Sequence, residues 1–445
     1  MAGKHQPARP GARSPSPPPE PVSVRITHVG ADGDGIATHP NGARLYVPAT
    51  VPGDLVHVRP SQRRGEAWAA DLETIEEAGP DRQEPACAHF SVCGGCVAQH
   101  WGDDGYLGWK IGRLTEGLRR AGYDDPPIAP VVRGHLGTRR RMDLAIRRIQ
   151  GGMTVGLHRG RGEDIVDIAE CPVLHPQLFH LIAPARAMLS GLGAIRREAS
   201  LAVNLLDSGP DLLLRTDGEL TLTDRVKLIA FAEAHALPRL SWSLNEGQAE
   251  AVCVLRPPVT NFAGVTVSPP AGAFLQATAE GEAAIVAAVI DGLPAKRVAR
   301  SRVLELYAGC GTIGFALAQQ IKVTAIEGDE ALVQAYHAAI NQAGLMGKVE
   351  VKRRDLVRQP FQAKELAGYT AVVLDPPHAG AQAQMPYLAQ SKVEAVIYVS
   401  CDPVSLGRDA AVLRAGGYRL EKVTPIDQFL WSARLETVAV FRLGR

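Results

Sequence analysis

The chain has 445 residues with 46% hydrophobic and 21% charged side chains, and its formal net charge is +1. Its length predicts two or three domains, and its composition is typical of a soluble globular protein rather than a collagen-like or coiled-coil chain. The absence of a long apolar run and of an apolar segment near the start argues against a membrane span and a secretory signal, and the balanced charge leaves a nucleic-acid partner to be judged from local patches.

Residues 1–21 contain seven prolines and few apolar side chains. This composition cannot bury enough surface to offset chain entropy, so we expect a disordered tail. Lys4, Arg9 and Arg13 could contact a polyanion there, although a solvated tail without a role is the simpler interpretation.

Residues 22–78 consist of short alternating segments such as VSVRITHV and DLVHVRPSQ, separated by the turn sequences GADGDG, HPNG and PGD. Short, evenly spaced strands with Gly and Asx turns predict a small β-barrel. The phrase THVGADGDGIA, followed by YVPATVPGDLVHV, resembles the TRAM domain, an OB-like barrel that carries RNA to tethered enzymes. The resemblance implies RNA binding, since OB-type barrels recognise single-stranded nucleic acid; a purely structural β-module is the alternative.

Cysteine usage indicates a metal site rather than disulfides. An odd number of cysteines, seven, without an export signal indicates reduced thiols and a cytoplasmic protein. Cys87, Cys93 and Cys96 lie within ten residues, and Cys171 is the best candidate for a fourth ligand. Four thiolates with this irregular spacing favour a [4Fe–4S] cluster, while zinc, which prefers paired C-x2-C units, stays as the alternative.

A basic stretch, GTRRRMDLAIRR (137–148), follows within the central region 79–260, which also contains apolar strand-like segments. Arginine neutralises phosphates and stacks on bases, so we expect RNA contact here, although a charge run is often only a solvated face. The residues concerned are Arg139, Arg140, Arg141, Arg147 and Arg148.

From about residue 261 to 445 the pattern alternates between strands and helices. We expect a helix over 330–342 that ends before Gly344, and the alternation predicts a parallel, doubly wound α/β sheet. The expected strands lie near 303–307, 322–327, 349–352, 371–375, 394–400, 418–424 and 436–442.

The phrase VLELYAGCGTIGFALA contains a G-x-G-x-x-G loop between a strand and a helix. Its glycines allow a nucleotide-like ligand to approach the backbone, which alone does not separate NAD(P) from S-adenosylmethionine. Glu305 favours the methyl donor, because it lies in the strand before the loop, where methyltransferases carry an acidic residue. Glu327 ends the next strand, where it could bind a ribose diol, but this feature also occurs in dinucleotide folds and discriminates poorly.

Two further segments place reactive side chains at strand ends. AVVLDPPHAG puts Asp375 after the fourth strand, with His378 where amino-group methyltransferases usually carry an aromatic residue. VEAVIYVSCDP puts Cys401 after the fifth, and a buried cysteine is more often a small core residue. Because this strand has ended and the position faces the expected donor, we interpret Cys401 as a nucleophile and expect some activation of its thiol, from a source that the sequence does not identify.

A thiolate beside a methyl donor suits methylation at carbon 5 of a pyrimidine. Addition of the thiolate to carbon 6 makes carbon 5 nucleophilic, and a base must afterwards remove the carbon-5 proton. In RLETVAVF, Glu436 lies at one end of the last strand and is a candidate for this base; a solvated carboxylate is an equal alternative.

Together these segments resemble the bacterial RNA (uracil-5-)-methyltransferases with a TRAM domain and an iron–sulfur cluster, which make 5-methyluridine in 23S rRNA. The resemblance covers about residues 22–445 and rests on CAHFSVCGGCVAQH, YLGWK, AFLQAT, LELYAGCGTIG, LDPPHAG, YVSCDPVSLGRDAAVL and RLETVAVF. It implies a class I Rossmann-like catalytic domain over 261–445, an iron–sulfur domain over 79–260, a TRAM barrel over 22–78 and a cytoplasmic monomer.

The resemblance also implies roles for individual residues. Cys401 is the nucleophile, Glu436 the proton acceptor, and Phe274 helps to form the base pocket. The cluster ligands are Cys87, Cys93, Cys96 and Cys171, and the S-adenosylmethionine pocket is lined by Gln276, Tyr307, Thr312, Glu327, Asp355 and Asp375.

The sequence departs from the family pattern at three positions: His378, Thr278 and Thr312 stand where Arg or Lys, Asn and Asn are usual. The sequence leaves several functions open besides methylation of 23S rRNA. They are the same chemistry on the T-loop uridine of tRNA, methylation of an exocyclic amine, an RNA-binding iron–sulfur protein without activity, and an NAD oxidoreductase.

Overall fold

A computed structural model describes residues 19–296 and 300–444 of the chain. It divides into two compact units: an N-terminal unit up to Gln83 together with 100–102, and a larger unit of 84–99 and the residues from Asp103 onward. Of the tail predicted over 1–21, residues 1–18, which include Lys4, Arg9 and Arg13, lie outside the described residues. No helix in the described ranges has the length and apolar character needed to cross a membrane.

The N-terminal unit is built on a six-stranded sheet in the order β1-β5-β6-β4-β3-β2. Side chains along β5 alternate between buried and less buried positions, as in a strand with one face on a core. That core contains Ile26, Val56 and Trp68. The strands are β1 (Val22–Arg25), β2 (His28–Val29), β3 (Gly35–Thr38), β4 (Arg44–Val47), β5 (Leu55–Arg64) and β6 (Ala67–Glu77).

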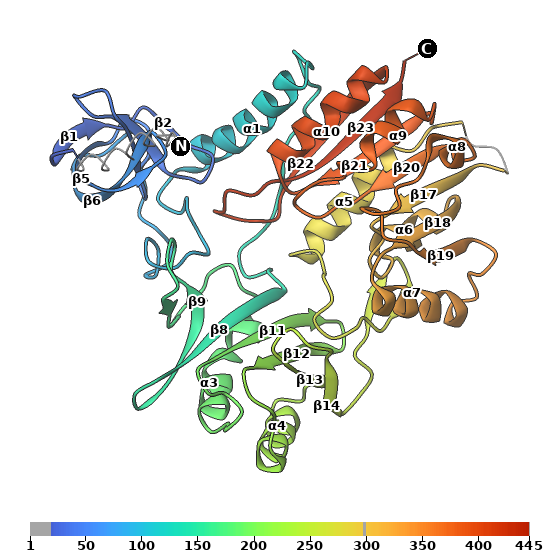
Figure 1. The fold of residues 1–445 in the computed structure, drawn as a ribbon, viewed down its shortest axis with the longest axis horizontal. Coiled ribbons are helices and arrows are strands. Elements are labelled where there is room, and N and C mark those ends of the chain that lie inside the picture. Colours follow the sequence, from blue (N-terminus) through green and yellow to red (C-terminus); the bar gives the residue numbers. More distant parts are fainter. Residues whose placement is uncertain (1–18, 297–299, 445) are drawn as a thin grey trace, which may run out of the picture. The chain divides into compact units, whose positions relative to one another are not determined.

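The central part of the larger unit is a seven-stranded sheet in the order β10-β9-β8-β11-β12-β13-β14. Helices α3 (Ile182–Ser190) and α4 (Leu222–Ala234) share one hydrophobic core with it (Figure 1). The short helix α2 (Pro176–Phe179) precedes them. The strands are β8 (Arg141–Ile149), β9 (Gly152–His158), β10 (Ile165–Val166), β11 (Glu198–Leu206), β12 (Gly209–Thr216), β13 (Arg239–Leu244) and β14 (Glu250–Val254).

The C-terminal part contains an eight-stranded sheet in the order β19-β18-β17-β20-β21-β23-β22-β7. The two-residue strand β7 (Val132–Arg133) joins its edge from upstream, and a hairpin of β15 (Thr260–Phe262) and β16 (Val265–Val267) precedes it. The other strands confirm the seven predicted positions: β17 (Arg302–Leu306), β18 (Lys322–Glu327), β19 (Val349–Arg353), β20 (Ala371–Leu374), β21 (Ala395–Ser400), β22 (Tyr418–Asp427) and β23 (Glu436–Leu443).

The prediction that all strands of this sheet are parallel is wrong for the last strand, β23. Strands β17 to β21 are parallel to their neighbours, but β23 runs antiparallel to both β21 and β22. The physical reason is the length of the connection: a parallel crossover takes about a dozen residues or more, and residues 428–435 are too few. The antiparallel direction brings the start of β23 to the end of β21.

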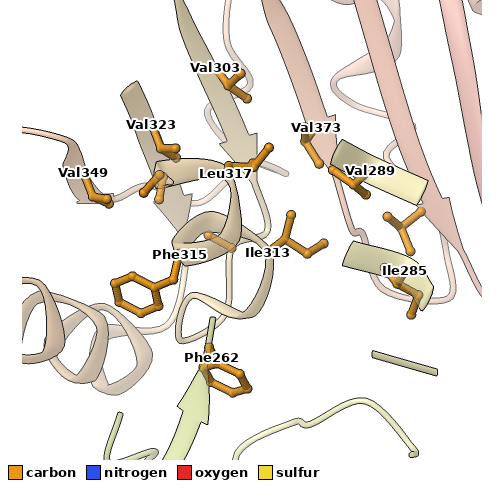
Figure 2. Close-up of a cluster of buried hydrophobic side chains, with 14 of the residues drawn as sticks. Phe262, Ile285, Val289, Val303, Ile313, Phe315, Leu317, Val323, Val349 and Val373 are labelled. Carbon is orange, nitrogen blue, oxygen red and sulfur yellow. The ribbon is translucent and has the colours of Figure 1, made fainter. Parts of the chain in front are cut away.

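Helices cover both faces of this sheet (Figure 1). Alternate strand residues divide between two cores, so that Val303 packs on one face and Leu304 on the other. The first core, shown in Figure 2, includes α5 (Ala279–Asp291), α6 (Thr312–Ala318) and α7 (Glu330–Gln342). The second includes α1 (Asp103–Arg120), α8 (Ala363–Leu366), α9 (Met385–Gln390) and α10 (Pro403–Ala415).

Helix α1 contributes to the second core of the C-terminal sheet, although it lies before residue 261, the predicted start of the catalytic domain. Leu114 and Leu118 of α1 are fully buried in the second core, next to Leu406 and Leu413 of α10. The segment 103–133 therefore belongs structurally to the C-terminal sheet, although it precedes the central sheet in the chain.

Candidate active site

Reactive side chains gather where the parallel strands end. Tyr307 follows β17, Glu327 ends β18, Asp355 follows β19, Asp375 follows β20 and Cys401 follows β21. Because these strands are parallel, their carboxyl ends share one edge of the sheet, the edge at which open α/β sheets bind ligands. The topology therefore brings together five residues that the sequence places up to 94 positions apart.

The glycine loop after β17 has the backbone that close approach to a ligand requires. Tyr307 has a φ of 62°, strained for a residue with a side chain, and Gly309 and Gly311 have φ values of 56° and 104°. A Cβ on Gly311 would meet the Phe315 ring at 2.5 Å, so packing excludes a side chain there. At Gly309 a Cβ would meet no atom within 4 Å, which leaves the backbone open to a ligand.

The carboxylate of Glu327 holds this loop. One oxygen accepts a hydrogen bond from the Gly309 N–H at 2.9 Å, and the other accepts from the N–H groups of Gly328 and Asp329 at 2.7 and 2.9 Å. Thr312 is half-buried at the start of α6, and Asp355 is exposed, its carboxylate accepting from the N–H of Val357 at 3.0 Å. The structure thus places these predicted residues around the glycine loop.

Glu305 has a different environment from the edge residues. It is buried under α6, where the Tyr336 hydroxyl donates to it at 3.4 Å and a Cβ on Gly314 would lie 2.2 Å from its oxygen. Burial raises the pKa of Glu305 to about 8. Glu305 therefore packs against the buried side of the glycine loop and α6.

A chain of side-chain hydrogen bonds joins Glu436 to Asp375. Gln428 donates through Nε2 to Oε2 of Glu436 and to Oε1 of Gln276, both at 2.9 Å. Gln276 in turn donates through its own Nε2 to Oδ2 of Asp375 at 3.2 Å. Two glutamine amides thus connect the start of β23 with the end of β20, through a residue that sequence reasoning did not identify.

The pairing of β21 with β23 places Cys401 beside Glu436. Ser400 pairs with Thr437, so the same antiparallel register continues to residues 401 and 436. Burial, and then the charge of Asp375, raise the pKa of Glu436 to about 8. Burial also raises the pKa of Asp375 to about 7. Two carboxyl groups with pKa values above the ordinary range therefore lie next to the thiol.

The described residues do not supply the activation expected for Cys401. Burial, and then the charge of Glu436, raise the pKa of the thiol to about 11, with Asp375 and Asp402 acting in the same direction. Arg434, an exposed residue of the loop before β23, opposes them. Burial of the thiol is therefore the main reason that it favours the protonated form, and the neighbouring carboxyl groups add to this effect.

The four predicted cluster ligands line one cavity of about 420 Å³ in the larger unit. Burial raises the pKa of each thiol, to about 11 for Cys96, and the half-buried Arg139 lies close enough to favour the thiolates of Cys171 and Cys96. In the described part of the chain, no group of three or more His, Cys, Asp or Glu side chains is placed to hold a metal ion. The four thiols are Cys87, Cys93, Cys96 and Cys171.

The same cavity reaches the loop between β22 and β23, since its lining includes Gln428 and Arg434. Backbone hydrogen bonds connect the two regions: the N–H groups of Val97 and Ala98 donate to the Trp431 carbonyl at 2.7 and 3.1 Å. The cysteine segment and the loop that leads to Glu436 are therefore in direct contact.

Four arginines of the basic stretch, for which we expect RNA contact, have partners within the protein. Arg140 is buried, forms an ion pair with Glu282 and donates to the Gln276 carbonyl at 2.9 Å. Arg141 donates to the Leu275 carbonyl at 3.0 Å and its guanidinium lies 4.5 Å from the centre of the Phe274 ring. Arg147 pairs with Glu198, and Arg148 donates to the carbonyls of Ile195 and Leu192.

Phe274 and His378 lie in exposed positions. The side chain of Phe274 is 61% exposed and is backed by Arg141, so its ring presents a free face. His378 is exposed, with Nε2 3.9 Å from the carboxylate of Asp402, the residue that caps α10. Phe274 is thus available to a ligand on the same segment as Gln276.

Sequence reasoning missed Gln428 and Arg434, which both lie between the last two strands. The position of these residues in the sequence was the available clue. The connection between the last two strands is short and leads directly to Glu436, so its residues have to lie close to the active site. Reading it required the antiparallel direction of β23, which the parallel prediction excluded.

Comparison with known proteins gives a consistent result. The model of the tRNA (uracil-5-)-methyltransferase family matches residues 269–442. An "uncharacterized RNA methyltransferase" of Brucella suis is 41% identical over 422 residues, which cover 95% of this chain and 98% of that protein. The 23S rRNA (uracil(1939)-C(5))-methyltransferase of Chromohalobacter salexigens is 32% identical over 427 residues, which cover 93% and 88%.

Among solved structures, the tRNA (uracil-54, C5)-methyltransferase of Pyrococcus abyssi, in complex with S-adenosyl-L-homocysteine, has a TM-score of 0.71. The match covers 94% of this chain and 100% of that one at 19% identity. At this identity the likeness concerns the fold, and it extends over both units of the chain.

Proposed function

Because the chain belongs to the RNA uracil-5-methyltransferase family, we propose that it methylates carbon 5 of a uracil in RNA, with 23S rRNA as its substrate. The observation that carries this proposal is the placement of Cys401 beside Glu436 at the carboxyl edge of the sheet. A thiol and a carboxyl group together supply the nucleophile and the base that this reaction needs.

S-adenosylmethionine, when bound, supplies the methyl group. The open backbone of Gly309 supports a donor site at the glycine loop, and Glu327 is placed to accept hydrogen bonds from a ribose diol. Gln276, Tyr307, Thr312, Asp355 and Asp375 line the rest of the proposed site. Asp375 and Gln276 connect this site with Glu436, so donor and base sites are parts of one hydrogen-bonded structure.

In the proposed reaction, the Cys401 thiolate forms a bond to carbon 6 of the uracil, and the displaced electron pair makes carbon 5 nucleophilic. Carbon 5 then takes the methyl group and S-adenosylhomocysteine leaves. Glu436 removes the carbon-5 proton, the double bond re-forms, and the sulfur–carbon bond breaks to return the thiolate. Phe274 offers a face on which an unstacked uracil can stack.

We also propose that the N-terminal unit is a TRAM-type RNA-binding module. Its six short strands and its turn sequences support this assignment. Because most arginines of the basic stretch are engaged inside the larger unit, this module carries more of the proposed RNA binding than the sequence suggested.

The substrate is tested by mapping 5-methyluridine with mass spectrometry in rRNA and tRNA from a strain that lacks this protein. We expect one 23S rRNA site to lose its methyl group and tRNA to remain modified. Methylation of the T-loop uridine of tRNA is the second candidate, because the matching family model is named for uracil-5 methylation of tRNA. Loss from tRNA alone would establish it instead.

The cysteine cavity supports a [4Fe–4S] cluster held by Cys87, Cys93, Cys96 and Cys171. Four thiols line one cavity beside the half-buried Arg139, although the described residues contain no group of three or more side chains already placed to hold a metal ion. Thiolates on one zinc ion would have to approach to about 4 Å of one another, as Zn–S bonds of about 2.3 Å require, whereas a polynuclear cluster spreads its ligands over several irons. Because the four cysteines are irregularly spaced and zinc sites usually use paired C-x2-C units, we propose a cluster rather than zinc.

Anaerobic purification is expected to yield a brown protein with about four irons per chain. Cys171→Ser should lower the iron content and weaken the visible absorbance, while Cys253→Ser, outside the cavity, should leave both unchanged. Iron and acid-labile sulfide are measured directly. Stoichiometric zinc in the anaerobic protein would contradict the assignment.

A further inference from the structure

We propose that Gln428 is a positioning residue for the proton acceptor: one amide group holds Glu436 in place for the carbon-5 proton and at the same time holds Gln276 against Asp375. The inference rests on the proposed function and assigns a role to a residue of the loop between β22 and β23. Its basis is geometric, because each polar atom of the Gln428 side chain has a defined partner.

The three contacts fix the orientation of the amide. Oε1 of Gln428 accepts from the Ala277 N–H at 3.1 Å, and this bond identifies the oxygen side of the group. Nε2 then directs its two hydrogens to Gln276 and Glu436, both at 2.9 Å. A carboxylate has no hydrogen to donate, and a hydroxyl has only one, so an amide is the group that satisfies all three partners.

The backbone of Gln428 is held by the residue before it. Asp427 is fully buried and accepts from Lys110 Nζ at 2.6 Å and from the Tyr106 hydroxyl at 3.2 Å, both on α1. The Asp427 carbonyl also accepts from the Gly134 N–H at 3.1 Å. A buried ion pair with further hydrogen bonds loses much stability when it is broken, so it fixes the start of the loop.

The side chain of Gln428 is confined from the other side by α5. A Cβ on Gly281 would lie 2.6 Å from Oε1 of Gln428 and 2.7 Å from its Cβ. Gly281 lies in the first turn of α5, and its backbone is not in the left-handed region. Alanine at this position would therefore favour the helix more than glycine does. The glycine therefore leaves room for Gln428, and packing and hydrogen bonds together leave its amide one position.

This arrangement affects how readily Glu436 accepts a proton. The charged and titratable groups that influence the site are Asp375 at the end of β20, Cys401 at the end of β21, Asp402 at the start of α10 and Arg434 in the loop. Hydrogen-bond donation by Gln428 favours the ionised carboxylate, which is the form that takes the proton. Without this donor the pKa of Glu436 rises, and proton removal requires a higher pH.

The test is Gln428→Met, which keeps the length of the side chain and removes its hydrogen bonds. With RNA tritiated at uracil carbon 5, methyl transfer and tritium release are followed separately in single turnovers at pH 6 to 9. We expect tritium release to slow by roughly 10- to 100-fold, since small misplacements at a reacting centre have such effects. A covalent methylated adduct should accumulate, and the acid limb of the release profile should move to higher pH.

Gln384→Met is the matched control, because Gln384 is a buried glutamine bonded to the N–H and C=O of Phe361 at 2.7 and 2.9 Å, away from the site. It should leave the ratio of release to transfer unchanged. Gly281→Ala displaces the side chain of Gln428 without replacing it and should also slow tritium release. If Gln428→Met does not fold, Gly281→Ala tests the positioning role instead.

Different results would contradict the proposed methylation activity and the proposed role of Gln428. If the wild-type protein forms no 5-methyluridine and no adduct on its RNA, the proposed function is wrong. If the wild-type protein is active, while Gln428→Met and Gly281→Ala release tritium at the wild-type rate and pH dependence, Gln428 has no positioning role. A change in KM alone, with normal release, would also overturn the inference.

Discussion

Cys401→Ser is expected to lower the rate of RNA methylation by roughly 10⁴-fold or more, in the range seen when a catalytic nucleophile is removed. The reason is chemical: carbon 5 of uracil becomes nucleophilic only after an attack on carbon 6, and a serine hydroxyl is a much weaker nucleophile than a thiolate. Single-turnover transfer of a labelled methyl group to the RNA measures the loss.

The control for this substitution is Cys253→Ser, since Cys253 is a half-buried cysteine of β14 in the central core. It should methylate RNA at the wild-type rate. Full activity of Cys401→Ser would instead indicate methylation of an exocyclic amine, which needs no covalent bond to the base.

Because the pKa of Cys401 is raised, a positive charge near the thiol is needed to stabilise its thiolate during the reaction. Among the described residues near the thiol, Arg434 is a cation that favours the thiolate, and it competes with three carboxyl groups. A cationic sulfonium donor bound near Asp375 would offset part of that negative charge. We therefore expect a larger fraction of Cys401 thiolate with the methyl donor bound than in the free protein.

The sequence predicted the elements of the catalytic sheet well because its signals are local. Apolar runs of strand length, the glycines 309 and 311 and the turn at Asp402-Pro403 each constrain a few neighbouring residues. The ends of the strands followed from these patterns, and with them the positions of Glu327, Asp375 and Cys401 at one edge.

The direction of the last strand could not be read in the same way. An apolar strand has the same composition in either direction, and in an all-parallel sheet Glu436 would lie at the edge opposite to Cys401. The antiparallel pairing of β23 with β21 removes this conflict and explains why a residue at the start of a strand meets residues at the ends of others.

Side-chain partners were the least accessible part of the prediction. Arg140 and Arg141 belong to a basic run that suggests a solvated or RNA-binding surface, yet they hold the segment of Gln276 and Phe274 from the central sheet. Whether an arginine meets a phosphate or a carbonyl depends on contacts between distant segments, and local composition carries no information about them.

Glu436→Gln is expected to slow product release by roughly 10²- to 10⁴-fold, the usual contribution of a general base. The amide keeps the shape of the side chain, and its oxygen can still accept from Nε2 of Gln428, so the site should remain folded. It has no basic group for the carbon-5 proton. Methyl transfer should therefore proceed, and the methylated RNA should stay attached to Cys401.

The trapped species is measured as a slowly migrating band of protein and labelled RNA on a denaturing gel. Glu421→Gln, a change of a surface carboxylate paired with Arg442 on β23, is the matched control and should give no band above wild type. Adding Cys401→Ser to Glu436→Gln should abolish the band, because the attachment requires the thiol.

The same experiment distinguishes between the two carboxyl groups of the site. Asp375 is joined to Glu436 through two glutamines and has its own raised pKa, so either group could in principle hold the proton. Release at the wild-type rate by Glu436→Gln would transfer the role to Asp375. Accumulation of the adduct assigns it to Glu436, whose position across from Cys401 in the strand register places it nearer to the carbon that loses the proton.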